Sequence, residues 1–326
     1  MQMPSARLIR CALLAAILLG VVSAVVGQIP PSTWIQLNPK HSPPQRAACS
    51  MAYDPVSHKV VMFGGFGRYR YFNDTWTFDG TNWKRQKAFV APSARAASSM
   101  AFDRVLQKLV LYGGYDGQNY QGDTWTWDGA TSIWTHLSPL RSPNPETAPM
   151  LFPDPRTGRV DNFGGFDGRF YSLTTWRWRD GTWHKLHPAQ SPTARGAAVF
   201  ATDPVRKQTV LFGGLAAVNP NNTWTYDGLT WTQQAPSNQP SYRFYSGAVY
   251  DPRFQGIVAF GGVSGGDVND SWLWDGADWQ QLTPAATPPA RESFGMAFDE
   301  LHQQTVIFGG LGGDALLRDT WVLQTK

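Results

Sequence analysis

Short apolar runs alternate with polar, turn-rich segments along most of the chain, and each apolar run ends on a pair of glycines. Val60-Val61-Met62-Phe63 before Gly64-Gly65 is the first example. The pairs are Gly64-Gly65, Gly113-Gly114, Gly164-Gly165, Gly213-Gly214, Gly261-Gly262 and Gly309-Gly310, at intervals of 49, 51, 49, 48 and 48 residues. A repeat of this length is typical of a propeller or a solenoid, in which each unit is one supersecondary element.

Each repeat predicts four short strands. In the first unit, a strand from Arg46 to Asp54 precedes the apolar strand that ends on the glycine pair. Thr75-Trp76-Thr77-Phe78 alternates with period two, which predicts a third strand with its aromatic side chains on one face. Asp79-Gly80 then predicts a tight turn into a fourth strand. No segment after the first thirty residues has sustained helical periodicity, so we expect an all-β protein.

A constant spacing links three positions in every repeat. A tryptophan precedes a marked position by 12 residues, and the first glycine of the pair follows it by 18. The marked positions are Arg46, Arg95, Glu146, Arg195, Arg243 and Arg291. Glu146 therefore occupies the place that an arginine has in the other five repeats.

These features resemble the kelch repeat: an apolar run, Gly-Gly, spaced aromatic residues and a tryptophan that opens the outermost strand. The resemblance covers about residues 34–326 and points to the galactose-oxidase-like propellers, in their exported, bacterial type. It implies a six-bladed β-propeller with four antiparallel strands per blade. The last repeat lacks a fourth strand, and Trp34-Ile35-Gln36-Leu37 has the sequence of one. We expect this N-terminal strand to complete the last blade.

The first residues predict an export signal. Arg7 and Arg10 precede an apolar run from Cys11 to Val26 that is shorter than the 20 or so residues a membrane span needs. We expect a signal peptide over residues 1–27, cleaved near 24–27, although a retained anchor is the alternative. The remaining residues 28–326 form one propeller domain, which we expect to be a secreted or periplasmic monomer without a membrane span.

Charge and cysteine content exclude several classes of protein. Loss of Arg7 and Arg10 reduces the net charge from +4 to +2, too little for a nucleic-acid-binding surface. Cys49 is then the one remaining cysteine, so we expect no internal disulfide. The six histidines are dispersed over different repeats, and we expect neither a metal site nor a cofactor.

The marked positions form one candidate binding site. In kelch propellers, arginines at this place can line a pocket near the channel, where guanidinium groups bind carboxylate, sulfate or phosphate. The alternative is that each arginine braces its own loops. A residue that recurs in five repeats suits either role.

Loops between the second and third strands form the other candidate site. Packing needs recur in every blade, yet aromatic residues occupy these loops in the first three repeats only. Exposed aromatic and arginine side chains on one sector have the composition of a recognition surface. The candidate residues are Arg68, Tyr69, Arg70, Tyr71, Tyr115, Phe166, Arg169 and Tyr171.

We expect binding rather than catalysis, because no nucleophile, base and acid stand out as a set. The partner would be a protein or a carbohydrate, held by loops on one face. An alternative is a sugar-active enzyme that resembles the sialic acid mutarotases, with Glu146 as acid and base among arginines that hold an acidic sugar. A third possibility is a scaffold within a larger envelope assembly.

Overall fold

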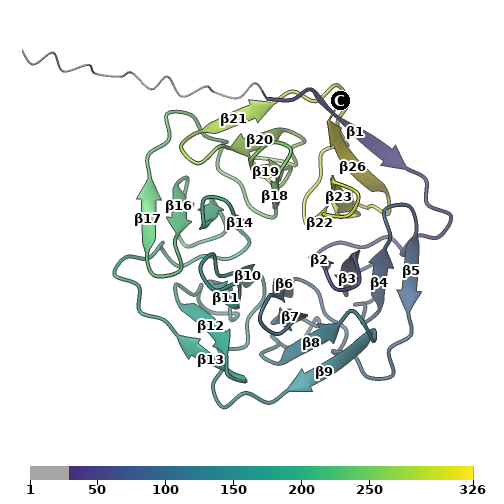
Figure 1. The fold of residues 1–326 in the computed structure, drawn as a ribbon, viewed down its shortest axis with the longest axis vertical. Coiled ribbons are helices and arrows are strands. Elements are labelled where there is room, and N and C mark those ends of the chain that lie inside the picture. Colours follow the sequence, from purple (N-terminus) through teal and green to yellow (C-terminus); the bar gives the residue numbers. More distant parts are fainter. Residues whose placement is uncertain (1–28, 326) are drawn as a thin grey trace, which may run out of the picture.

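The computed structural model describes residues 29–325 and confirms the predicted six-bladed β-propeller. Six antiparallel sheets of four strands each surround a central channel (Figure 1). Blades 1 to 5 are built from consecutive strands, in the order β2 to β21. None of the described residues is helical. The predicted signal peptide lies outside the described residues, so its cleavage and the export of the chain stay predictions.

Within each blade the strands follow the order that the repeat predicts, from the channel outward. The innermost strands are β2 (Ser50–Asp54), β6 (Ser99–Asp103), β10 (Met150–Pro153), β14 (Val199–Asp203), β18 (Gly247–Asp251) and β22 (Gly295–Asp299). The second strands are β3 (Lys59–Phe63), β7 (Lys108–Tyr112), β11 (Val160–Phe163), β15 (Gln208–Phe212), β19 (Gly256–Phe260) and β23 (Gln304–Phe308). The third strands are β4 (Thr75–Phe78), β8 (Thr124–Asp128), β12 (Thr175–Arg179), β16 (Thr223–Tyr226), β20 (Ser271–Trp274) and β26 (Thr320–Thr325). The outermost strands are β5 (Trp83–Gln86), β9 (Ile133–Leu137), β13 (Thr182–Lys185), β17 (Trp231–Gln234), β21 (Trp279–Leu282) and β1 (Ser32–Leu37).

The N-terminal strand closes the ring, as the sequence predicts. β1 pairs with β26 in the order β1-β26-β23-β22, so the two ends of the described chain meet in blade 6 (Figure 1). Trp34 lies opposite Leu323 in this pairing. A small hairpin of β24 (Leu311–Gly312) and β25 (Ala315–Leu316) extends the loop that follows β23.

The tryptophans of the outermost strands join neighbouring blades. The indole N–H of Trp134 donates to Thr75 Oγ1 of blade 1 at 2.8 Å, and Trp183 donates to Thr124 Oγ1 of blade 2 at 2.9 Å. The same contact recurs around the ring in Trp34–Ser271, Trp83–Thr320, Trp231–Thr175 and Trp279–Thr223. These indoles are almost fully buried, which identifies them as packing between blades rather than as exposed stacking platforms.

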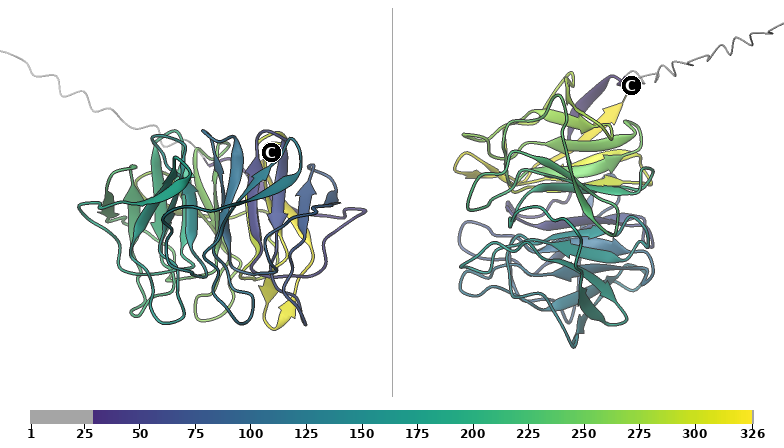
Figure 2. Two further views of the ribbon diagram at one scale, coloured as in Figure 1. Left: turned by 90° about the horizontal axis from the view of Figure 1, so that it is seen from below. Right: turned by 90° about the vertical axis from the view of Figure 1, so that its left-hand side faces the viewer.

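The strands run across the thickness of the ring, so their connections gather on two opposite faces (Figure 2). We call the upper face the one that carries the connections from second to third strands and from each blade to the next. This face points downward in the left view of Figure 2, where the yellow β24–β25 hairpin projects from it. The lower face carries the turns from first to second and from third to fourth strands. Both candidate sites of the sequence therefore belong to the upper face.

Candidate functional site

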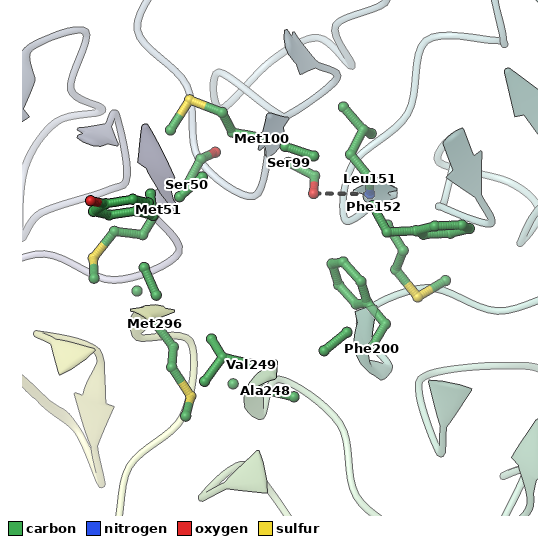
Figure 3. Close-up of a pocket in the computed structure, with 18 of the residues that line it drawn as sticks. Ser50, Met51, Ser99, Met100, Leu151, Phe152, Phe200, Ala248, Val249 and Met296 are labelled. Atoms are coloured by element: carbon green, nitrogen blue, oxygen red, sulfur yellow. Dashed lines mark hydrogen bonds between the residues drawn. The ribbon is translucent and has the colours of Figure 1, made fainter. Parts of the chain in front are cut away.

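The central channel is an apolar cavity of about 660 Å³ between the innermost strands. The labelled side chains in Figure 3 show this character, because most of them are hydrocarbon or thioether groups. They include Met51, Met100, Leu151, Phe200, Val249 and Met296. Serine hydroxyls in the wall already have partners: Ser50 Oγ donates to the carbonyl of Ser98 at 2.7 Å, and Ser99 Oγ accepts the N–H of Leu151 at 3.1 Å. The strands of the channel wall thus offer few groups that would recognise a charged sugar, and the polar residues Arg104, Gln107 and Glu300 line the cavity from the turns of the lower face.

A closed ring of backbone hydrogen bonds surrounds the upper end of the channel. In each blade, the N–H of the second residue after the marked position donates to the carbonyl of its counterpart in the preceding blade, as in Ala97 to Ala48 at 2.8 Å. The six residues are Ala48, Ala97, Ala148, Ala197, Tyr245 and Ser293, all with φ between 50° and 55°. This left-handed backbone interrupts strand geometry. The first strand therefore begins at Ser50 rather than at Arg46, which corrects the predicted boundary.

The five arginines of the marked positions do not line this cavity. Arg95 shows their arrangement: its Nη1 donates to the carbonyl of Gly113 at 3.2 Å, and its two Nη atoms grip the carboxylate of Asp123. Its remaining donors contact the carbonyl and hydroxyl oxygens of Ser93 at 3.0 and 2.7 Å. The corresponding pairs are Arg46–Asp74, Arg195–Asn222, Arg243–Asp270 and Arg291–Asp319.

These contacts support the bracing role rather than the anion pocket. All five arginines are at most 1% exposed. Burial raises the pKa of the facing carboxyls, but hydrogen bonds from the arginine and its positive charge outweigh burial and leave the pKa below its usual value. This holds for Asp74, Asp123, Asp270 and Asp319. Four of the five guanidinium groups are therefore neutralised inside the protein, and Arg195 meets the amide of Asn222 instead. All five fix the glycine pair to the start of the third strand.

Blade 3 breaks this pattern with Glu146. Its carboxylate accepts a hydrogen bond from Asn162 Nδ2 at 2.9 Å, and its side chain is only 2% exposed. Burial raises the pKa of Glu146 to about 8, Asn162 opposes the shift, and the charge of Asp167 adds to it. The glutamate therefore lies inside blade 3, outside the central cavity, and it does not face a sugar-sized pocket together with the arginines.

The aromatic residues of the upper loops form a continuous row, which we call the aromatic arc. Taken in sequence order, the centroids of successive rings in this row are 6.4, 6.2, 5.0, 6.1 and 4.8 Å apart. The arc consists of Phe66, Tyr71, Tyr115, Tyr120, Phe166 and Tyr171, two from each of blades 1 to 3. All six rings are partly exposed. The structure thus brings four of the predicted residues, Tyr71, Tyr115, Phe166 and Tyr171, into one surface.

Glycines let the arc cross from blade to blade. A Cβ atom on Gly117 would lie 2.7 Å from a ring carbon of Tyr71, and one on Gly168 would lie 2.4 Å from a ring carbon of Tyr120. Both glycines have positive φ, at 102° and 96°. Each tyrosine therefore rests on bare backbone of the next blade's loop, in a place that no side chain could share.

The other predicted residues of these loops lie at the exposed tips. Tyr69 is 86% exposed, and Arg68 lies over its ring with Cζ 5.3 Å from the centroid. Arg70 lies over Phe72 at 4.9 Å, and Arg169 lies over Phe170 at 5.0 Å. The arc is therefore bordered by arginines whose charged ends are accessible to a partner.

Sequence reasoning missed three further aromatic residues of the upper face. Tyr242, Phe244 and Tyr245 come from the connection between blades 4 and 5, and their ring centroids are 6.0 and 5.3 Å apart in sequence order. Burial raises the pKa of Tyr242, and the charge of Tyr171 adds to the shift. The sequence signal for these residues is Tyr242-Arg243-Phe244-Tyr245, which surrounds a marked arginine and lies outside the loops that follow the glycine pairs.

Within residues 29–325, no group of three or more His, Cys, Asp and Glu side chains is placed to hold a metal ion. A membrane-crossing helix is likewise not found in this part of the chain. Cys49 is a buried thiol whose pKa burial raises to about 11, so it is protonated and unreactive at neutral pH.

Comparison with known protein families agrees with the architecture. Residues 25–152 match the KLHDC2/KLHL20/DRC7 kelch-repeats domain. This segment contains β1, blades 1 and 2 and the beginning of blade 3. A comparison with curated proteins gave no match. The first part of the propeller therefore matches a kelch-repeats domain, and the same lattice of tryptophans, glycine pairs and marked positions continues through the remaining blades.

Proposed function

We propose that the protein is a non-catalytic binding module that holds a protein partner on its upper face, with the aromatic arc as the contact surface. The arc is the observation that carries the proposal. Rings from three blades form one partly exposed row, and their tyrosines are fixed by close packing rather than free in solvent. Pre-positioned aromatic side chains give large contact area at low cost in conformational entropy, and tyrosine and arginine are enriched at the centres of protein interfaces.

The kelch-repeat match favours a protein over a glycan as the partner, because kelch propellers are typically protein-binding scaffolds. Partly exposed tyrosines also suit the faces of sugar rings, so a carbohydrate is the competing ligand. The enzyme alternative has less support. Glu146 is enclosed in blade 3, and the five arginines that would hold an acidic sugar are engaged by protein groups. Export from the cell stays part of the proposal on the strength of the N-terminal sequence.

Selection from a random peptide display library tests this function directly. The chain is immobilised, and binding clones are then measured on a Tyr71→Ala, Tyr115→Ala variant. Tyr53→Ala is the matched control, because Tyr53 is a partly exposed tyrosine of the lower face. We expect selected peptides to lose at least about tenfold in affinity on the arc variant and to bind the control unchanged, since central aromatic anchors are each worth more than 1 kcal/mol.

The same proteins on a glycan array decide between the two ligand classes. Glycan binding that requires Tyr71 and Tyr115, without any selected peptide, would replace the protein partner by a carbohydrate. Peptides that bind the arc variant and wild type equally well would show that the arc is not the binding surface.

A further inference from the structure

In five blades a positively charged group fills the space between the glycine pair and the start of the third strand. Nη1 of each arginine donates to the carbonyl of the first glycine, at 2.9 to 3.3 Å. The neighbouring oxygen ligands come from the residue that opens the third-strand segment, aspartate in four blades and Asn222 in blade 4. In each of these blades, oxygen atoms therefore surround the single positive charge of the guanidinium group.

Blade 3 keeps the carbonyl of the first glycine but lacks both the cation and the carboxylate that faces it in four other blades. Glu146 replaces the arginine, and Thr174 replaces the aspartate. A Cβ on Gly165 would lie 2.6 Å from Cδ of Glu146, and one on the equivalent Gly114 would lie 3.1 Å from Cδ of Arg95. The two Cδ atoms thus occupy corresponding places. Arginine continues beyond Cδ with its guanidinium, whereas glutamate ends at Cδ with two oxygen atoms, so residue 146 itself supplies no cation in blade 3.

The groups around this place in blade 3 are mostly hydrogen-bond acceptors. Glu146 receives one side-chain donor, Asn162 Nδ2, and Asn162 Oδ1 is a buried atom without a hydrogen-bond partner. No described side chain donates to the carbonyl of Gly164, which corresponds to the carbonyls that accept from arginine elsewhere. Both Glu146 and Asn162 are at most 2% exposed. An unpaired buried carboxylate and an unpartnered amide oxygen are each unfavourable without a compensating group.

We propose that this place in blade 3 binds a monovalent metal cation, Na⁺ or K⁺, through oxygen atoms of Glu146, Asn162 and the carbonyl of Gly164. Carboxylate, amide and carbonyl oxygens are the ligands of hard cations. The single carboxylate of Glu146 balances the charge of a monovalent ion, whereas a divalent ion would leave a net positive charge buried. The ion would take over the charge that the guanidinium supplies in the other blades. The raised pKa of Glu146 agrees with a carboxyl group that lacks its counter-ion.

Thermal unfolding in different chloride salts at equal ionic strength tests the proposal. The chain is unfolded in choline chloride, NaCl, KCl and CaCl₂ at pH 8.5, where proton competition for Glu146 is weak. The variants are Glu146→Gln, which removes the charge at constant size, and the double variant Glu146→Arg, Thr174→Asp, which restores the pair of the other blades. Glu292→Gln is the matched control, because Glu292 is a partly exposed glutamate elsewhere on the upper face.

We expect Na⁺ or K⁺ to raise the wild-type melting temperature above that in choline, by about 3 °C for each tenfold excess over the dissociation constant. Glu292→Gln should respond like wild type. Glu146→Gln and the double variant should not respond, and the double variant should melt at least as high as wild type, which shows that its blade is intact. The shift should also shrink at pH 6, where a proton competes with the ion.

Three results would overturn the proposal. Equal melting temperatures in choline, NaCl and KCl would identify Glu146 as a neutral acid that needs no ion. A cation effect that survives Glu146→Gln would place the ion elsewhere. A shift by Ca²⁺ alone that Glu146→Gln abolishes would replace the monovalent ion by a divalent one. Because the readout is stability, all three are independent of whether the aromatic arc binds a partner.

Discussion

Arg195 donates from Nη1 to the amide oxygen of Asn222 at 3.0 Å, whereas the other four marked arginines meet a carboxylate. Burial lowers the pKa of Arg195 to about 10. The indole nitrogen of Trp224 is also left without a partner. Its counterparts in the other five blades each donate to the aspartate or threonine two residues earlier, at 2.6 to 3.0 Å; they are Trp76, Trp125, Trp176, Trp272 and Trp321. One asparagine thus leaves both a buried cation and a buried indole incompletely satisfied.

Asn222→Asp should therefore stabilise the protein. The new carboxylate would pair with Arg195 and accept the indole N–H of Trp224, as Asp270 does for Arg243 and Trp272. We expect a gain of about 1–3 kcal/mol in the free energy of unfolding at pH 7, the usual worth of hydrogen bonds to charged groups. Urea unfolding measures it. A loss of stability would mean that desolvation of the new carboxylate outweighs its pairing.

The matched change in blade 3 should have the opposite sign. Thr174→Asp places a carboxylate at the repeat position that corresponds to Asn222. In blade 3, however, Glu146 takes the position of the arginine that would pair with it. Two buried acids without a guanidinium repel each other, so we expect destabilisation or a rise in the pKa of one of them. Comparison of the two variants separates the effect of the pair from the effect of the position.

The repeat predicts the positions of these residues but not their contacts. Constant spacing places Glu146 in the arginine slot, and the prediction of six blades closed by the N-terminal strand is confirmed by the pairing of β1 with β26. Spacing does not reveal that Glu146 meets Asn162, because that contact depends on a polar residue in β11 where other blades have apolar ones. Spacing likewise does not show whether an arginine points into the channel or into its blade, because this depends on its contacts, which for Arg95 are Gly113 and Asp123.

The sequence likewise predicts some features of the aromatic arc and not others. An asymmetry in composition identifies Tyr71, Tyr115 and Tyr171, since features required for packing would recur in every blade. It does not show which rings touch across blades, because this depends on the bare backbone at Gly117 and Gly168. The same asymmetry does not identify Tyr245, because this residue lies in a connection between blades and not in a loop after a glycine pair.

Stability should fall as the pH rises from about 5 to 8. Burial raises the pKa of Glu146 to about 8, and burial raises that of Asp161 to about 7 although Arg177 opposes the shift. The folded chain therefore retains protons that the unfolded chain has released, so the stability that these acids contribute is present below their unfolded pKa and lost as the pH rises through the folded value. The slope is about 1.4 kcal/mol per pH unit for each acid.

Urea unfolding in choline buffers, without Na⁺ or K⁺, measures this slope. Glu146→Gln should remove the share of Glu146 between pH 5 and 8, and the difference between wild type and variant isolates that share from all other groups. If the two proteins have parallel pH profiles, Glu146 is ionised throughout this range.

Gly117→Ala and Gly168→Ala should disrupt the aromatic arc. The added methyl group would meet the ring of Tyr71 or Tyr120 well inside contact distance, so the ring must move. Both changes also introduce strain at positive φ, which Gly265→Ala shares in blade 5, where a Cβ atom has open space around it. We expect all three variants to lose about 1 kcal/mol of stability from backbone strain, and only the first two to lose affinity for peptides selected on the upper face. Equal loss of affinity in Gly265→Ala would attribute the effect to general loosening of the loops.

The side chain of Trp34 should help to keep the propeller ring closed, in addition to the stability that its burial contributes. It is 2% exposed, its indole N–H contacts Ser271 Oγ at 3.4 Å, and its ring lies 5.1 Å from that of Phe260 in blade 5. Trp34→Ala should cost about 3–5 kcal/mol, as large aromatic truncations in cores do. Trp83→Ala removes the equivalent residue of blade 1, where the strand is continuous with its own blade. β1 is joined to blade 6 by non-covalent contacts, namely its pairing with β26 and backbone hydrogen bonds to Ala285 and Ala286. The Trp34 variant should therefore expose β1 to limited proteolysis under conditions where the Trp83 variant resists cleavage of that segment. Equal protection of β1 in the two variants would show that the β1–β26 hydrogen bonds close the propeller without help from the indole.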